Sequence, residues 1–192
     1  MPRQVFAFDQ PERFIAGTVG QPGERTFFLQ AKSGERVTSV ALEKIQVAAL
    51  AERLSELLDE VRRRLGDEVS IPPVAPGELD DNAPLDTPLL EEFRVGTLAL
   101  AWDTDDNRVV IEAHAQTEGE ESTDVEPLSD DEDGPDVLRV RITPEQARAF
   151  AKRAEQVVAA GRPPCPFCVL PLDPENHICP RQNGRRASPN RR

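Results

Sequence analysis

The sequence predicts an α+β fold of two pseudo-repeated antiparallel strand–strand–strand–helix units, followed by a C-terminal zinc knuckle. Three observations support this prediction. Short segments of alternating apolar residues are separated by turn residues, which is typical of strands. Two long segments have apolar residues at helical spacing. All three cysteines of the chain lie between Cys165 and Cys179.

The length and charge of the chain limit the classes of protein that it can represent. A chain of 192 residues, 38% of them hydrophobic, can build one ordinary domain with its own core. Its net charge of −12 argues against general binding to nucleic acid or to an anionic membrane, because polyanions repel an acidic surface. No apolar run approaches the ~18 residues of a membrane-spanning helix. The apolar block Val5–Phe8 is too short for a secretory signal. We therefore expect a cytoplasmic protein without membrane contact.

The first unit is expected at about residues 4–66. A helix should run from about Glu43 to Leu65, because leucines recur there at helical spacing and Gly66 can end it. Strands joined by short turns favour antiparallel pairing. Four segments alternate as strands do and are separated by glycine- or proline-containing turns: residues 4–9, 14–19, 25–31 and 36–42.

A proline-rich linker at 67–92 precedes a second unit at 93–161. The segment 27–31 (FFLQA) is similar to 109–113 (VVIEA), and the helix residues 46–58 are similar to 146–158. A shorter similarity joins FIAGT at 14–18 to FRVGT at 93–97. The order of the matches is preserved, so we infer an internal duplication within one body of residues 1–161. Whether the two units share one sheet stays open.

The second unit contains an insertion at 118–136 and a clear helix start. The insertion has ten acidic residues and no basic ones, so it cannot bury enough apolar area to order itself, and we expect a disordered loop. The last strand is expected at 137–142. Thr143 and Gln146 form the pattern of a capping box, with Pro144 at the first helical position, and Gly161 can end the helix.

The C-terminal segment 162–184 has the ligand types of a zinc knuckle. Cys165-Pro-Phe-Cys168 is followed by His177-Ile-Cys179, and Cys3His is one of the ligand sets that hold structural zinc. A segment this short has almost no core, so bound Zn²⁺ would supply its folding energy. The one-residue gap between His177 and Cys179 is tighter than usual and requires extended backbone. Residues 185–192 are expected to form a basic, disordered tail.

Two alternatives for the cysteines remain. The segment can be a reduced tail without metal, or Cys165 and Cys168 can form a redox pair. A redox Cys-x-x-Cys pair normally opens a helix after a strand, whereas these two residues follow a helix. Clustered cysteines in a cytoplasmic chain also fit metal ligands better than a disulfide framework. We therefore favour zinc.

Two other patterns have weaker functional interpretations. His114 shares one face of a predicted strand with Glu112, which could orient it as a general base. We favour the simpler interpretation, a polar residue on the wetter face of a strand. The segment 103–107 (DTDDN) resembles the start of a calcium loop, but Arg108 stands where glycine is needed and His114 where glutamate is needed. We expect a hairpin turn there.

The opening residues 4–8 (QVFAF), the duplicated units and the C-terminal motif resemble an actinobacterial family described as a putative repeat protein, a domain of unknown function. The most specific part of the resemblance is CPFC at 165–168 together with DPENHICPRQNG at 173–184. The resemblance extends over essentially the whole chain. It implies the duplication and the knuckle, and it supplies no activity.

Three functional hypotheses follow. We favour a non-catalytic, zinc-binding interaction or adaptor protein whose partner is another protein. The alternative is an enzyme acting on a small phosphorylated or thiol metabolite in a cleft between the repeats, although no Gly-x-Ser-x-Gly or His-Glu-x-x-His motif is present. The third is a weak nucleic-acid binder through the knuckle and the arginine tail, which the acidic body disfavours. No catalytic residue is assigned.

Overall fold

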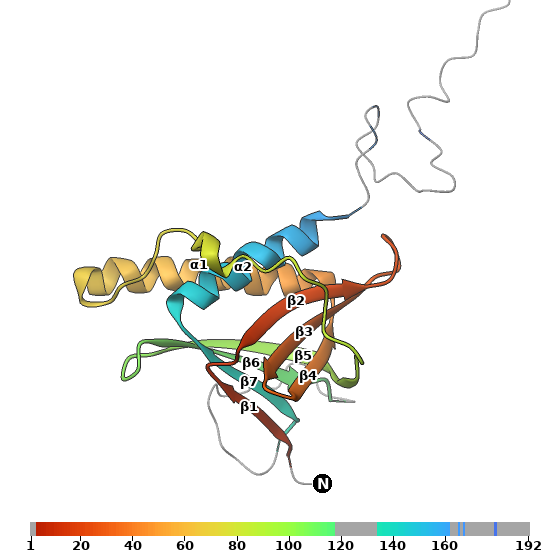
Figure 1. The fold of residues 1–192 in the computed structure, drawn as a ribbon, viewed down its shortest axis with the longest axis horizontal. Helices are drawn as coiled ribbons and strands as arrows, with labels where there is room; N and C mark the ends of the chain where they lie inside the picture. The colour runs from red at the N-terminus through yellow and green to blue at the C-terminus, as the bar shows by residue number, and fades with distance from the viewer. Residues whose placement is uncertain (1–2, 118–133, 162–164, 166, 168–178, 180–192) are drawn as a thin grey trace, which may run out of the picture.

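The computed structural model describes residues 3–117, 134–161, 165, 167 and 179. Its centre is one seven-stranded sheet in the order β1-β7-β6-β5-β4-β3-β2. The two helices α1 (Lys44–Leu65) and α2 (Pro144–Ala159) lie against each other on one side of this sheet (Figure 1). The strands are β1 (Val5–Asp9), β2 (Arg13–Val19), β3 (Thr26–Ser33), β4 (Arg36–Leu42), β5 (Glu91–Asp103), β6 (Arg108–Ala115) and β7 (Val137–Ile142).

The sheet consists of two antiparallel groups joined by parallel pairs. Strands β2, β3 and β4 pair antiparallel and precede α1, and strands β5, β6 and β7 pair antiparallel and precede α2. The expected antiparallel pairing is therefore correct within each group. It is wrong for β1, which pairs parallel with β7 and not with β2, and the two groups meet where β4 pairs parallel with β5. A parallel pair needs a crossover connection, which α1 and the segment after it provide between β4 and β5. Both groups share one sheet.

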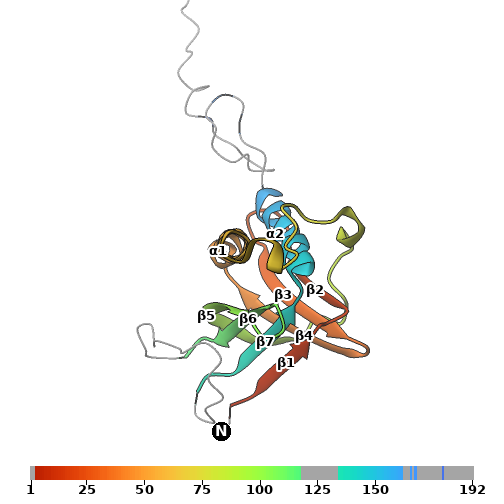
Figure 2. The same cartoon turned by 90° about the vertical axis from the view of Figure 1, so that its left-hand side faces the viewer.

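Strong curvature brings the two ends of the sheet together. Strands β1 and β2 are consecutive in the chain but stand at opposite ends of the strand order. The chain changes direction between them at Gln10, which follows β1 and has a φ of 49°. The Gln10 amide donates to the Arg141 carbonyl at 2.9 Å. The guanidinium of Arg36, from β4, lies 4.0 Å from the ring centre of Phe8 in β1. Figure 2 shows the two strand groups running in different directions below the helices.

The core lies between the sheet and the two helices. Alternate residues of β3 and β6 face it, including Leu29 and Ile111, which are 0% and 1% exposed. Helix α1 contributes a stripe that includes Leu54 and Leu58, as its helical periodicity predicts. Helix α2 contributes Phe150, whose ring stacks on Phe14 of β2 with centroids 4.5 Å apart. One continuous core therefore unites both strand groups.

The helix ends agree with the sequence signals. Gly66 is the C-cap of α1 with a φ of 53°, a conformation that favours glycine. Thr143 accepts a hydrogen bond from the Gln146 amide at 3.1 Å, and Pro144 occupies the first turn of α2. Helix α2 ends at Ala159, just before the expected stop at Gly161. The segment 104–107 forms the turn of the β5–β6 hairpin, which confirms that expectation.

Two predicted segments lie mostly or entirely outside the described residues. The acidic loop 118–136 lies outside the described residues except for 134–136, where the Asp136 carboxylate accepts a hydrogen bond from the Gln4 amide at 2.8 Å. The tail 185–192 lies entirely outside them. In the described part of the chain, no helix is long and apolar enough to cross a membrane.

Candidate functional site

Two of the four predicted zinc ligands lie together. The Sγ atoms of Cys165 and Cys179 are 3.9 Å apart, and the two residues are 3% and 4% exposed. Their separation is far longer than the roughly 2.05 Å of a disulfide bond, so the two sulfurs are not bonded to each other. Two sulfur ligands that each lie roughly 2.3 Å from a tetrahedral zinc are roughly 3.8 Å apart. The observed separation is close to this value, and it is also the distance of a hydrogen bond between two thiols.

The other two predicted ligands, Cys168 and His177, lie outside the described residues. Within the described residues, no group of three or more histidine, cysteine or acidic side chains is arranged to hold a metal ion. A group of three could not be found there, because only two of the four predicted ligands are among the described residues. The closed set of four thus stays a prediction.

A second candidate is the buried polar cluster around His114. Strand β6 places Glu112 and His114 on the side of the sheet that faces away from the core, yet each residue is only 1% exposed. The expectation of a wetter face for His114 is therefore wrong. The Nε2 atom of His114 lies 3.1 Å from Glu112 Oε2, and Arg139 of β7 donates from Nε to Glu112 Oε1 at 2.6 Å. Arg3 approaches His114 Nδ1 at 3.5 Å.

Burial controls the charge of this histidine. Loss of hydration lowers the pKa of His114 below its ordinary value, and the positive charges of Arg3 and Arg139 lower it further. Glu112 acts in the opposite direction but does not outweigh burial. The imidazole is therefore neutral at pH 7. A general base must also reach a substrate, and His114 lines neither of the two pockets described below. The geometry favours a structural role.

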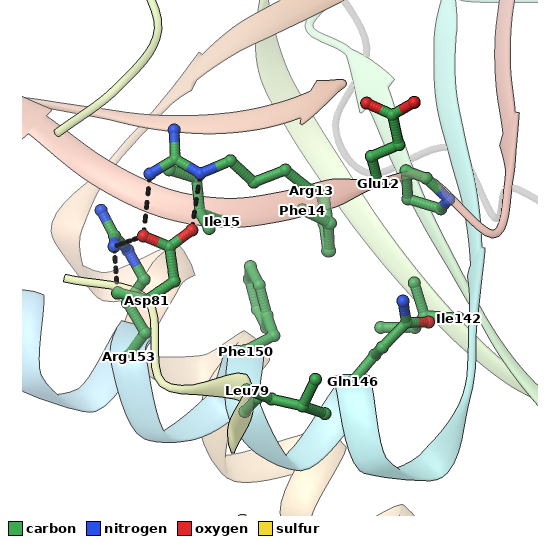
Figure 3. A pocket seen from close by; sticks show the side chains of 12 residues that line it. Glu12, Arg13, Phe14, Ile15, Leu79, Asp81, Ile142, Gln146, Phe150 and Arg153 are labelled. Carbon is green, nitrogen blue, oxygen red and sulfur yellow. Dashed lines mark hydrogen bonds and ion pairs between the residues drawn. The ribbon is translucent and has the colours of Figure 1, made fainter. Parts of the chain in front are cut away.

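A small pocket lies between β2, α2 and the linker (Figure 3). Its volume is about 100 Å³, well below the ~300–1,000 Å³ of typical small-molecule sites. In Figure 3, Asp81 of the linker lies between the guanidinium groups of Arg13 and Arg153 at one side of the pocket. Its lining consists of Pro11, Glu12, Arg13, Phe14, Ile15, Leu79, Asp81, Ile142, Gln146, Ala149, Phe150 and Arg153.

The charged groups of this pocket bind one another. Arg13 donates to both carboxylate oxygens of Asp81, at 2.6 and 2.9 Å, and to Asp86 at 2.7 Å. Arg153 donates to the Ala16 carbonyl at 2.8 Å and to the Ala83 carbonyl at 2.7 Å. These contacts tie the linker to β2 and α2, and they use donors that a ligand would need.

The same contacts shift the ionisation of three side chains. The hydrogen bond to Asp81 raises the pKa of Arg13, and the hydrogen bond from Arg13 lowers the pKa of Asp81. Burial lowers the pKa of Arg153, which stays charged at pH 7 because its ordinary value is far higher. All three groups are ionised, so the cluster is a network of ion pairs rather than an acid–base pair.

The linker is fastened at a second point, on the outer side of β3. The side-chain amide of Gln30 donates to the Asp86 carbonyl at 3.1 Å and accepts from the Asp86 amide at 2.7 Å. Gln30 also donates to Ser39 Oγ at 3.0 Å, and Lys32 Nζ lies 2.8 Å from Asp86 Oδ1. A buried glutamine amide thus satisfies the backbone of the crossing segment.

Sequence reasoning missed these linker contacts. Arg13 and Asp81 are 68 positions apart, and Arg153 and Asp81 are 72 apart, so no local spacing relates them. The prolines predicted a linker at 67–92, but they did not indicate against which strand and helix it lies. A signal was present only at Gln30, a polar residue inside an otherwise apolar strand.

The fold and the thiol pair define an α+β protein with a curved mixed sheet, two helices on one side, and two adjacent cysteines after the last helix. The chain belongs to the family described as Protein of unknown function (DUF3090), whose model matches residues 6–179. The matched range contains both strand groups and ends at Cys179, so all four predicted zinc ligands lie within it. No curated protein and no solved structure matches the chain.

Proposed function

We propose that this protein is a non-catalytic, zinc-containing binding protein of the cytoplasm. In this proposal Cys165, Cys168, His177 and Cys179 hold one structural Zn²⁺. The supporting observation is the separation of 3.9 Å between the Sγ atoms of Cys165 and Cys179, both of which are buried. Four protein ligands would leave no open position for water or substrate, which is the difference between a structural and a catalytic zinc site.

The surroundings of the thiols agree with this role. Cys165 and Cys179 are not joined to each other by a disulfide bond, and reduced thiols persist in reducing compartments such as the cytoplasm. The segment that holds them is too short to fold around a core of its own, so the metal would supply its stability. Zinc would act there as a cross-link between the two ends of the segment 165–179.

At the small pocket, the arrangement favours a binding role over catalysis, because its charged groups form ion pairs rather than an acid–base pair. The charged side chains Arg13, Asp81 and Arg153 are occupied in holding the linker. The pocket volume of about 100 Å³ is too small for most metabolites. We therefore propose that the body presents its surface to another protein, and that the zinc segment extends that surface.

The zinc proposal is tested by metal analysis of the full-length protein purified without added metal. We expect one zinc per chain, and we expect release of zinc when the thiols are alkylated under reducing conditions. His177→Gln should lower the zinc content, whereas His114→Gln, which changes the only other histidine, should leave it unchanged. Protein that contains no zinc and has three freely titratable thiols would overturn the proposal.

We also infer that the two strand groups are copies of one unit, and the pairing registers support this. Phe27 pairs with Leu42 as Val109 pairs with Ile142, and Lys32 pairs with Val37 as His114 pairs with Val137. The same correspondence makes β1 and β2 together equivalent to the single long strand β5. Arg13 of β2 pairs with Lys32, just as Thr97 of β5 pairs with His114.

This correspondence changes one detail of the sequence comparison. Phe14 pairs with Ala31, and Leu98 pairs with Ala113. By register, Phe14 is therefore equivalent to Leu98, although the sequence similarity had matched it to Phe93. The first copy changes direction at Gln10, whereas β5 runs on through the equivalent position with a register shift between Val95 and Thr97. A duplicated body of this kind has a natural junction between its copies, where α1 and α2 meet.

A further inference from the structure

A second pocket lies where the two strand–helix groups meet, beside the end of α2. Its volume is about 460 Å³, within the ~300–1,000 Å³ range of small-molecule sites. The β2–β3 turn, β3 and the first residue of α1 form one side, and the end of α2 forms the other. It is lined by Gly23, Arg25, Phe27, Lys44, Val158, Ala159 and Gly161.

Two cations converge in this pocket. A Cβ atom placed on Gly161 would lie 3.7 Å from Lys44 Nζ and 3.8 Å from Arg25 Nη2. This point is only one bond length from the Gly161 Cα atom, so it shows how close the two cations are to each other rather than where a ligand would lie. The guanidinium of Arg25 lies 5.8 Å from the ring centre of Phe27, which places it over the apolar floor of the pocket.

These cations have no carboxylate of their own within the described residues, where neither Arg25 nor Lys44 forms an ion pair. Arg13, Arg141 and Arg148 by contrast all bind carboxylates. The chain has 35 acidic residues against 23 basic ones, so carboxylates are plentiful. Two like charges held near one point repel each other unless an anion lies between them. The arrangement is suited to an anion that comes from outside the chain.

The distances fit an oxyanion. An oxygen that accepts a charge-assisted hydrogen bond lies ~2.8 Å from the nitrogen, so the central atom of the oxyanion lies roughly 3.5–4 Å away. The nitrogens of Arg25 and Lys44 lie within 3.8 and 3.7 Å of one point and are therefore at most about 7.5 Å apart, so one oxyanion can contact both. The N-cap of α1 is Glu43, and its carboxylate pairs with Arg94 at 2.7 Å rather than with Lys44.

We propose that this pocket binds a small phosphate monoester. The phosphate lies between Arg25 and Lys44, and the apolar part of the ligand packs on Phe27 and Val158. A phosphate group carries close to two negative charges at pH 7, which matches the two cations. The proposal does not depend on zinc, because none of the residues that form this pocket belongs to the predicted metal site.

The test is calorimetric titration of the full-length protein with inorganic phosphate and with phenyl phosphate, which adds an aromatic ring. Phenyl phosphate should bind at least about tenfold more tightly than inorganic phosphate, because its ring buries apolar area on Phe27 and Val158. Arg25→Gln and Lys44→Gln should each weaken phenyl phosphate about tenfold or more, because each removes a charge-assisted hydrogen bond. Arg53→Gln is the control, since it removes one exposed positive charge of α1 outside the pocket.

A further variant tests the position of the anion. Ala159 is exposed at the end of α2, so Ala159→Glu should leave the fold intact while placing a carboxylate beside both cations and abolishing binding. The thermal stability of each variant shows whether it is folded. No binding at millimolar phenyl phosphate, or equal loss with Arg53→Gln, would overturn the proposal. Zinc content is measured in the same samples, so that the two proposals fail or succeed separately.

Discussion

The imidazole of His114 lies 3.1 Å from the carboxylate of Glu112, and both side chains are almost completely removed from water. Arg139 binds the other oxygen of the same carboxylate at 2.6 Å. The result is a charged network within a sheet, in which the histidine is the neutral member. Two predictions concern this network, and two concern the linker and the metal.

The first prediction is a loss of stability in mild acid that depends on His114. Burial lowers the pKa of His114 in the folded protein, so the unfolded chain binds a proton more readily. The contribution of neutral His114 to the free energy of unfolding is complete above its unfolded pKa of about 6.5. It decreases as the pH falls from that value towards the folded pKa. Urea denaturation at about pH 7.5 and about pH 5.5 measures this change.

The matched control is His114→Gln, which can keep a hydrogen bond to Glu112 but does not titrate. The variant should lose less stability than the natural chain over the same pH interval. The lowered pKa values of Asp81 and Asp86, which Arg13 and Lys32 stabilise as carboxylates, affect a lower pH range and do not interfere. An identical acid response in both proteins would contradict the prediction.

The second prediction is a large destabilisation by Arg139→Met. The substitution keeps an apolar stem but removes a cation that binds the buried Glu112 carboxylate. Breaking one partner of a buried pair typically costs about 3–5 kcal/mol. Arg53→Met, at an exposed position of α1, serves as the control and should change the free energy of unfolding by less than about 0.5 kcal/mol. Adding Glu112→Gln to Arg139→Met should recover part of the loss, and no recovery would refute the ion-pair interpretation.

The third prediction concerns the contact between β2 and the linker. A Cβ atom on Gly17 would lie 2.6 Å from the Cγ atom of Leu85, far inside van der Waals contact. Gly17→Ala should therefore destabilise the protein by about 1–3 kcal/mol, as overpacking commonly does. The measurement is chemical denaturation of the two single variants and of the double variant with Leu85→Ala. If the linker lies on β2 as described, the two effects are not additive, whereas simple additivity would argue against this contact.

The fourth prediction concerns removal of the metal. If zinc cross-links the C-terminal segment, a chelator should make cleavage by a protease faster in residues 162–184 and leave cleavage within residues 3–117 and 134–161 unchanged. The body has its own continuous core, so its unfolding midpoint should shift little. Mass spectrometry of the fragments identifies the cleavage sites. Equal cleavage with and without chelator would count against a metal cross-link.

Helix positions and helix ends could be predicted from the sequence because their signals are local. The leucine stripe of α1, its stop at Gly66 and the cap at Thr143 each involve residues within a few positions of one another. Turn residues located most strands for the same reason. Cys165 lies beside Cys179, while the full set of four zinc ligands that the cysteine spacing indicates stays a prediction.

The sequence by itself thus determined the secondary structure, the α+β class and the location of the candidate metal ligands. Only the tertiary structure decided that the two groups share one sheet through parallel pairs, that His114 is buried, and that Asp81 binds both Arg13 and Arg153. The physical reason is that these contacts join residues brought together by folding of the whole chain. Backbone periodicity reports which side of an element is apolar, but it does not report which distant segment covers the other side.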